Sequence, residues 1–461
     1  MNDDQIHLVT HLSIEDRVAL GKAAREQVSR KTHGEWAPAA DRPNPVDLIA
    51  GQATTRVPEL VPLRHGRMAA SAFAFYRGAA LVMAADLAAV PHSGLTVQLC
   101  GDAHLANFGV FNTPERNLVF SVNDFDETLP GPFEWDVKRL AASFVLGCRD
   151  NGLKDAVAME AARTCVRTYR ESMAEFSQLR TLQLWYQGMW ADDLIAGLKD
   201  RAHRQRGLKR VQKERSKSIA EDLFPKLAEH QGEMPVIKDQ LPTIFHRKGL
   251  PPGEIHKEMQ DALAVYRSTL PTVYQALLDR YELRDAAMKV VGVGSVGTYC
   301  FVLLFMAGEG DPLFLQVKEA RASVLEPFAG KSAFANHGQR VVHGYRMMQP
   351  ASDLFLGWSV GPRRHFFVRQ LRDIKISLRV ETFGSTEMGI YATWCGRALA
   401  LSHARSGSAA MLCGYMGKSD VLDKAIGDFS MAYADQSEED HRLLDRAVKD
   451  GTLEAEFEEE K

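Results

Sequence analysis

Residues 98–109 read QLCGDAHLANFG, and residues 121–127 read SVNDFDE. Together these two stretches hold an acid, an imidazole, an amide and three further acids. The flanking residues 95–100 and 117–123 alternate apolar and polar positions, a pattern typical of half-buried strands. The sequence therefore predicts two strands whose ends carry a concentrated set of polar side chains.

The side chains at these strand ends suit a divalent cation and a phosphate. Asn107 offers an amide oxygen and Asp124 and Asp126 offer carboxylates, hard ligands of the kind that Mg²⁺ takes while keeping waters and substrate phosphates. Asp102 is a further carboxylate that can orient a hydroxyl or accept its proton during attack on phosphorus. Asp102 and Asn107 are spaced as in the D-x-x-x-x-N of a phosphotransferase loop. The structural alternative is a pair of polar turns, which collect Asp and Asn for conformational reasons.

A second motif lies in residues 289–297, KVVGVGSVG, whose glycines spell G-x-G-x-x-G. That pattern serves either a dinucleotide-binding fold or a kinase phosphate loop. Residues 298–318 are rich in β-branched and aromatic side chains and predict strand, turn and strand, whereas a dinucleotide fingerprint opens a helix. The motif thus favours a glycine hairpin over phosphates, with Lys318 reaching them from the next strand and Glu326 as its ion-pair partner. The expected nucleotide-binding residues are Gly292, Gly294, Ser295, Gly297, Lys318 and Glu326.

Both motifs resemble the protein-kinase-like superfamily, especially the aminoglycoside and choline kinase branch. The catalytic loop of that branch runs H-G-D-x-H-x-x-N, and its metal-binding acid lies in I-D-[FW]. Residues 101–107 and 122–125 are similar to these two patterns, although Cys100 stands in place of the usual histidine. Downstream, Asp136 begins DVKRLA, which resembles the D-L-A of the same branch.

The resemblance implies a role for each polar residue of the first motif. It implies that Asp102 orients or deprotonates the acceptor and that His104, with Lys318, stabilises charge on the phosphates of ATP. It also implies that Asn107, Asp124 and Asp126 hold Mg²⁺.

The two motifs occur in reverse order compared with ordinary kinases, in which the glycine loop and the lysine come first. We therefore expect a circular permutation, which a fold tolerates because chain ends lie at its surface. Residues 366–373 resemble the last small-lobe strand and the hinge. Residues 398–407 resemble the end of the helix that precedes the catalytic loop in small-molecule kinases.

The expected fold is α+β and bilobal, kinase-like and circularly permuted, with a small β-rich lobe and a larger, mainly helical lobe. Helical periodicity is expected over 66–90 and over most of 155–285, apart from one charged interruption. The expected parts are an N-terminal arm at 1–60, the catalytic-loop part of the large lobe at 61–285, the small nucleotide-binding lobe at 286–376, and a C-terminal helical part with an acidic tail at 377–461.

Longer phrases resemble one bacterial family directly, domain-of-unknown-function family 2252. They include CGDAHLANFG, NDFDETLPGPFEWDVKRLAAS, VGVGSVGTY and RVVHGYRMMQPASDLFLGW. The resemblance spans roughly residues 45–440 and implies a kinase-like fold without naming a substrate.

Composition excludes several classes of protein. The 461 residues carry a net charge of −3, and 45% of them are hydrophobic, which argues against disorder and against a dedicated nucleic-acid binder. The most apolar run, 78–90, contains Asp86 and is shorter than the roughly 20 residues of a membrane span. The acidic start, MNDDQIHLVT, is unlike a secretory signal. Six scattered cysteines without a CxxC pair are typical of free thiols, so we expect a cytoplasmic protein.

One charged segment leaves two interpretations open. Nine of the nineteen residues at 199–217 are Lys or Arg. They can form a solvated helix face or loop, or a patch facing phosphate or nucleic acid.

The expected function is Mg²⁺-ATP-dependent phosphoryl transfer to a hydroxyl or amine of a small molecule. A protein-modifying kinase or nucleotidyltransferase would use the same residues, and a catalytically silent module would bind nucleotide without turnover. A dehydrogenase is the remaining alternative, disfavoured by the strand that follows the glycines.

Overall fold

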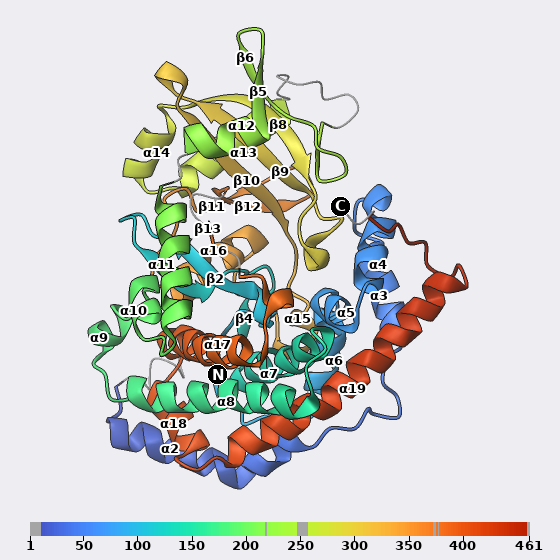
Figure 1. The fold of residues 1–461 in the computed structure, drawn as a ribbon, viewed down its shortest axis with the longest axis vertical. Coiled ribbons are helices and arrows are strands. Elements are labelled where there is room, and N and C mark those ends of the chain that lie inside the picture. The colour runs from blue at the N-terminus through green and yellow to red at the C-terminus, as the bar shows by residue number, and fades with distance from the viewer. Residues whose placement is uncertain (1–10, 217–218, 247–256, 372–374, 377, 459–461) are drawn as a thin grey trace.

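The computed structural model describes residues 11–216, 219–246, 257–371, 375–376 and 378–458 (Figure 1). The chain is α+β, with 55% of these described residues in helices and 15% in strands. This confirms the expected class. Parts of four expected segments lie outside the described residues: 1–10 of the arm, 217 of the basic stretch, 372–373 of the hinge and 459–461 of the tail.

A six-stranded antiparallel sheet forms the upper part of the molecule in Figure 1. Its order is β11-β12-β10-β9-β8-β7. The strands are β7 (Ile244–Phe245), β8 (Glu282–Lys289), β9 (Cys300–Met306), β10 (Pro312–Ala320), β11 (Gly357–Val360) and β12 (His365–Gln370). Strand, turn and strand follow the glycine motif, as expected. Lys318 on β10 lies opposite Cys300 on β9 and Phe367 on β12.

Both faces of this sheet are covered, which explains its apolar strands. On one face Val302, Leu304 and Phe314 pack beside α12 (Phe224–Leu227) and the hairpin of β5 (Ala228–Gln231) and β6 (Met234–Ile237). On the other face Leu303 and Leu315 pack beneath α13 (Lys257–Thr269) and α14 (Thr272–Leu278).

Two expectations of long helical stretches need correction. Residues 155–285 include β5, β6 and β7 and the start of β8, because tertiary packing on the sheet overrides local helical preference. Residues 66–90 form parts of three helices instead of one: α4 (Val61–Ala69), α5 (Ala72–Gly78) and α6 (Ala80–Ala88). Ser71 causes the first break because its hydroxyl accepts from Ala74 N and caps α5.

The larger, lower part of the molecule is a helical body around the main hydrophobic core. Helix α7 is buried almost all round, so its apolar residues extend beyond a single stripe. The principal helices are α7 (Phe133–Asp150), α8 (Asp155–Phe176), α16 (His337–Met348), α17 (Ser385–Ser406), α18 (Ala409–Met416) and α19 (Val421–Lys449).

The described part of the N-terminal arm wraps this body. Helix α2 (Ile14–Gln27) packs on α18, and α3 (Pro45–Ala53) packs on α6 and α19. Trp36 makes an edge contact with the Tyr433 ring at 4.9 Å. The described part of the arm is therefore helical in part and packs against the body.

The basic stretch forms α11 (Arg201–Arg215), beside the smaller helices α9 (Thr181–Trp185) and α10 (Ala191–Ala196). Val211 is its buried residue, and its charged side chains lie at the surface or partly exposed. The described part of the basic stretch is thus a surface helix, and its binding of phosphate or nucleic acid stays a prediction. Along the described ranges, no helix combines the length and the apolar character needed to cross a membrane.

Two small sheets carry the first motif between the helical body and the large sheet. Strand β1 (Thr96–Leu99) pairs with β4 (Leu129–Pro132). Strand β2 (Phe108–Asn112) pairs with β3 (Leu118–Val122) and with β13 (Lys375–Ile376). The acids of both sequence stretches therefore follow β1 and β3 into a common space.

Candidate active site

The turn after β1 is built around Gly101 and Asp136. Gly101 has φ +82°, and a Cβ there would lie 2.3 Å from the carbonyl oxygen of Glu127, so only glycine fits. The Asp136 carboxylate accepts from Cys100 N at 2.7 Å and from Gly101 N at 3.1 Å. His403 on α17 lies 3.2 Å from the same carboxylate. Buried hydrogen bonds from two distant helices thus set the direction of the Asp102 side chain.

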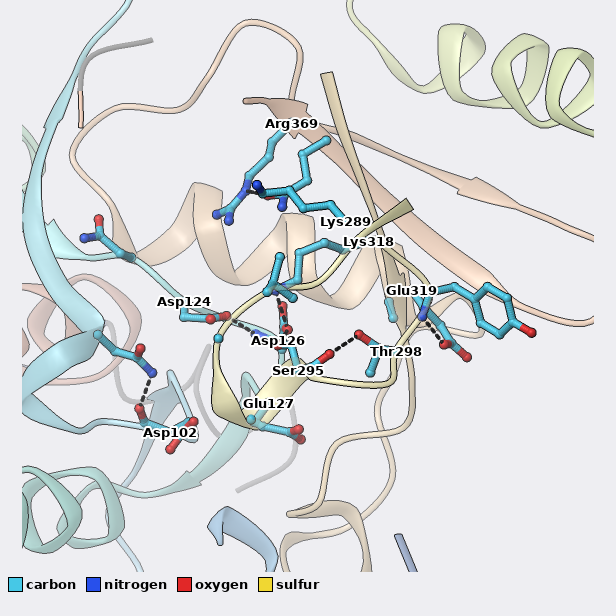
Figure 2. Close-up of a pocket in the computed structure, with 18 of the residues that line it drawn as sticks. Asp102, Asp124, Asp126, Glu127, Lys289, Ser295, Thr298, Lys318, Glu319 and Arg369 are labelled. Carbon is cyan, nitrogen blue, oxygen red and sulfur yellow. Dashed lines mark hydrogen bonds and ion pairs between the residues drawn. The ribbon is translucent and has the colours of Figure 1, made fainter. Parts of the chain in front are cut away.

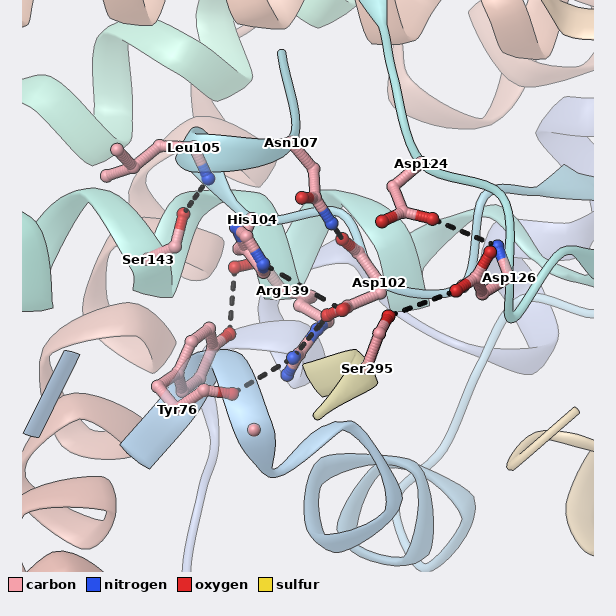
Figure 3. Close-up of polar contacts among 12 residues, drawn as sticks. Tyr76, Asp102, His104, Leu105, Asn107, Asp124, Asp126, Arg139, Ser143 and Ser295 are labelled. Carbon is pink, nitrogen blue, oxygen red and sulfur yellow. Dashed lines mark hydrogen bonds and ion pairs between the residues drawn. The ribbon is translucent and has the colours of Figure 1, made fainter. Parts of the chain in front are cut away.

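Asp102 forms an ion pair with Arg139 of α7 (Figure 3). Arg139 Nε donates to Asp102 Oδ1 at 2.7 Å, and Arg139 Nη2 also donates to Tyr76 O. Burial raises the pKa of Asp102 above its ordinary value even though Arg139 opposes that shift. The carboxylate is held in place and is a better proton acceptor than an exposed aspartate.

Asn107 and Asp102 are connected within the loop. Asn107 Nδ2 donates to the carbonyl oxygen of Asp102 at 2.9 Å, which leaves the amide oxygen of Asn107 available to a ligand. Asn123 N donates to Asn107 O at 2.8 Å and joins the two acid-bearing turns.

Lys318 lies among the acids of the second turn (Figure 2). Its Nζ is 2.6 Å from Asp126 Oδ2, and Asp126 is 192 positions away in the chain. Asp124 and Asp126 raise the pKa of Lys318 although burial opposes them. Burial tends to raise the pKa of Asp124, but Lys318 and Arg369 outweigh it and hold that pKa below the usual value. The site therefore contains an ionised Asp124 beside a charged lysine.

The glycine turn lies across from these acids. It forms a short 3-10 turn, Val293–Ser295, between β8 and β9. Ser295 Oγ donates to Asp126 Oδ2 at 3.2 Å, and a Cβ on Gly294 would be 4.0 Å from Asp102 Oδ2. The turn thus contacts the first motif directly.

These groups line one cavity of about 1710 Å³. Of the expected residues, those lining it are Asp102, His104, Asn107, Asp124, Asp126, Gly292, Gly294, Ser295 and Lys318. Gly297 adjoins Arg56, another lining residue, at the base of the same turn. The two motifs, which are far apart in the sequence, are therefore neighbours in space.

Two expectations change. Lys318 pairs with Asp126, while Glu326, at the start of α15 (Glu326–Ala329), faces His337 at 3.8 Å and does not line the cavity. The expected Lys318–Glu326 ion pair is therefore wrong. His104 is buried, and burial together with Arg77 and Arg139 lowers its pKa well below the ordinary value. His104 is therefore neutral, and its expected role in stabilising charge on the phosphates would rest on hydrogen bonding and not on a positive charge.

The comparison with family models matches residues 56–447 to a family described as an uncharacterized protein conserved in bacteria (DUF2252). The chain belongs to this family. Neither the curated proteins nor the solved structures contain a match. The direct resemblance seen in the sequence is confirmed, while the kinase resemblance of this DUF2252 chain stays a prediction.

Two residues of the site in this DUF2252 chain, Arg369 and Arg139, were not predicted from the sequence. Arg369 on β12 donates to Tyr345 Oη and to Gln316 Oε1, and its guanidinium faces Asp124 and Lys318. Arg139, three residues after Asp136, forms the ion pair with Asp102. The phrase DVKRLA already contained Arg139, so that signal was present, whereas nothing local to VRQLRD marks Arg369 as a site residue.

The oxygen donors fit a hard divalent cation. Asp126 Oδ1 is buried without a hydrogen-bond partner among the described residues, and the oxygen of Asn107 is available beside ionised Asp124. Within the described chain, no three His, Cys, Asp or Glu side chains form a complete metal cage. This donor set therefore suits Mg²⁺, which takes one or two protein oxygens and completes its shell with water and phosphates.

Proposed function

We propose that this protein is a Mg²⁺-ATP-dependent phosphotransferase with a circularly permuted kinase-like fold, acting on a small-molecule hydroxyl or amine. The observation that carries the proposal is the 2.6 Å contact between Lys318 and Asp126. It joins a strand lysine that follows a glycine turn to the second acid turn, which is itself hydrogen-bonded through Asn123 N to Asn107 of the loop with the D-x-x-x-x-N spacing. Phosphoryl transfer requires such a convergence because both groups of residues act on one set of phosphates.

The path of the backbone supports the permutation. Gln98 N on β1 donates to Ser406 Oγ at the end of α17, at 3.0 Å. The end of α17 therefore lies against the strand before the acid loop, although the chain between them runs through the whole six-stranded sheet. A permuted chain keeps this contact and breaks only the peptide connection.

In this proposal, groups on the six-stranded sheet bind the negatively charged phosphates of ATP. Lys318, Arg369 and the glycine turn line the cavity with the acids, and the two side chains together with backbone amides of the turn would bind phosphate oxygens. Lys318 stays protonated because its pKa is raised, and Arg369 takes the charge-stabilising role expected of His104. Helix α16 contains no Asp or Glu that could form an ion pair with Lys318. In the absence of phosphates, the partner of Lys318 is therefore Asp126.

Chemistry in this proposal centres on Asp102. Its carboxylate would accept a hydrogen bond from the attacking hydroxyl or amine and take its proton. Arg139 is a positioning residue because it holds Asp102 from the α7 side. Asn107, Asp124 and Asp126 would hold Mg²⁺, which when bound neutralises charge on the transferring phosphate.

Thermal unfolding with ligand tests the proposal. Mg²⁺-ATP should give a saturable rise in Tm that shrinks when EDTA replaces Mg²⁺, because a ligand that binds only the folded state stabilises it. NAD(H) should give no shift. Asp124→Asn should lose the Mg²⁺-dependent part, and the matched control Asp261→Asn, at an exposed position of α13, should keep it.

A clear NAD(H) shift without one from ATP would overturn the proposal, and so would equal shifts in wild type and Asp124→Asn. Transfer itself is then tested with ATP labelled at the γ-phosphate or the α-phosphate against a panel of acceptors. Label transferred only from the α-phosphate would make the protein a nucleotidyltransferase.

A further inference from the structure

The cavity extends past Asp102 into a second space that the proposed chemistry does not use. This space lies between α3–α5 on one side and the glycine turn with residues 319–324 on the other. Its cationic residues are Arg56, Arg64, Arg77 and Arg321, here called the arginine compartment. Three of them line the cavity, and Arg64 lies fully buried behind Arg56.

The guanidinium groups of the arginine compartment are incompletely paired. Within the described residues, the buried Nε atoms of Arg56, Arg77 and Arg321 have no hydrogen-bond partner, and neither do Nε and Nη1 of Arg64. Leaving buried donors unpaired costs free energy, more so when the donor is charged. The described chain therefore supplies fewer acceptors than these guanidinium groups can use.

Positive charge exceeds negative charge there. Burial and the neighbouring Arg321 lower the pKa of Arg56 to about 10, and burial with Arg56 and Arg321 lowers that of Arg64. Nearby carboxylates are already engaged. Glu319 pairs with Arg321 at 3.0 Å and with Arg364 at 3.3 Å.

Two further carboxylates near the arginine compartment also have partners. Asp102 pairs with Arg139. Glu127 accepts from Val324 N at 2.7 Å. A cationic surplus is left beside the proposed acceptor position.

The rim of the same cavity already binds a carboxylate of the chain. Arg67 of α4 lines the cavity and donates to Val291 O beside the glycine turn. It also donates to both carboxylate oxygens of Glu458, at 2.8 and 2.6 Å. A forked pair of this kind is the usual way in which arginine binds carboxylate or phosphate.

We propose that the arginine compartment binds an anionic group, a phosphate or a carboxylate, on the acceptor, with Arg77 as the central contact. Arg77 interacts electrostatically with Asp102, and its backbone carbonyl adjoins Gly294, so an anion bound there places the rest of the acceptor beside Asp102. The assignment of this anion to an acceptor rests on the proposed phosphotransferase function. It makes the site unfavourable for cationic acceptors such as amino sugars or choline, because like charges repel.

Binding of two probes, inorganic phosphate and succinate, tests the compartment. We expect at least one of them to raise the Tm of the wild type, and Arg77→Met to weaken that binding by about 10- to 100-fold, the range for losing a charged hydrogen-bond donor. Arg77→Lys should keep most of the binding. The matched control Arg363→Met removes an exposed cavity arginine and should leave both probes unaffected. Circular dichroism checks the fold, and Arg77→Gln replaces any variant that unfolds.

A second binding experiment tests whether the anionic probe and the nucleotide occupy different sites. With saturating Mg²⁺ and a non-hydrolysable ATP analogue, the probe should still bind and still depend on Arg77. Competition between analogue and probe would overturn the proposal, because these arginines would then belong to the nucleotide site. Equal probe binding by wild type and Arg77→Met would also overturn it. Arg77-dependent probe binding without any ATP binding would retain an anion site while rejecting the phosphotransferase function.

Discussion

The two halves of the cavity balance their charges differently. In the acid half, Asp124 and Asp126 stand against Lys318 and Arg369, and Lys318 has a carboxylate at 2.6 Å. In the arginine compartment, buried guanidinium nitrogens lack partners among the described residues. The acid half is close to electrically complete by itself, whereas the arginine compartment needs an anion to become so.

The difference in pairing distinguishes side chains that stabilise the fold from side chains that are available to a ligand. A buried charge with a close partner is costly to disturb, because removing one partner leaves the other unpaired. A buried charge without a partner contributes little to stability and is retained for another reason. Stability and ligand binding should therefore respond in opposite ways in the two halves.

The largest effect is expected at Asp102, where the halves meet. Asp102→Asn keeps the size of the side chain but removes the proton acceptor, so turnover should fall by roughly 10²–10⁴-fold. Affinity for Mg²⁺-ATP should stay near that of the wild type. Steady-state kinetics per folded molecule, together with nucleotide titration, measures both. Unchanged turnover after correction for unfolded protein would reduce this loop to a structural turn.

The second-largest effect is expected on the free energy of unfolding, which should respond differently to substitutions in the two halves. Lys318→Met should lower the free energy of unfolding by about 3–5 kcal/mol, because Asp126 loses its buried partner. Arg77→Met should change it by less than about 1 kcal/mol or raise it, since a poorly paired cation is removed. Urea unfolding without ligand measures both. Equal losses of unfolding free energy in the two variants would contradict the difference in charge pairing between the halves.

The third effect is a pH dependence at Glu127, which lies between the halves. Burial raises its pKa from 4.5 to about 6 in the folded protein, so the folded state binds this proton more tightly than the unfolded state. Stability therefore falls as pH rises from about 4.5 to 6, by up to about 2 kcal/mol. Glu127→Gln cannot ionise and can still accept from Val324 N.

The variant Glu127→Gln should thus be more stable than the wild type at pH 7.5 and equal to it near pH 4. Urea unfolding of the two proteins across this range gives the difference directly. A difference that stays constant with pH would mean that the carboxyl group titrates normally.

The smallest effect separates two glycines of the turn. Gly297 has φ +82°, and a Cβ there would lie 3.1 Å from the side chain of Arg56, so Gly297→Ala should cost about 1–2 kcal/mol. Gly292 has φ −56° and open space around it, so Gly292→Ala should leave stability within about 0.5 kcal/mol. Its cost should appear in ATP affinity, because the open space is where a phosphate would approach. Reversed behaviour of the pair would remove the ligand role from Gly292.

Sequence reasoning was most accurate where local pattern decides the structure. The alternation around residues 95–123 predicted the strands that precede the acids, and the residues after Gly297 predicted two strands in place of a helix. It was wrong over residues 228–245, where strands form because they pack on the sheet. It was also wrong at Ser71, whose capping hydrogen bond divides the predicted helix.

The sequence by itself determined the inventory of the site: the acids at 102, 124 and 126, the amide at 107, the glycine turn and Lys318. Contacts between distant segments set the partners: Lys318 pairs with Asp126, Asp102 pairs with Arg139, and several guanidinium nitrogens of the arginine compartment stay without a partner among the described residues. The reason is physical. Turns and strands follow from neighbours in the chain, whereas ion pairs and the burial that shifts a pKa depend on groups brought together from distant segments.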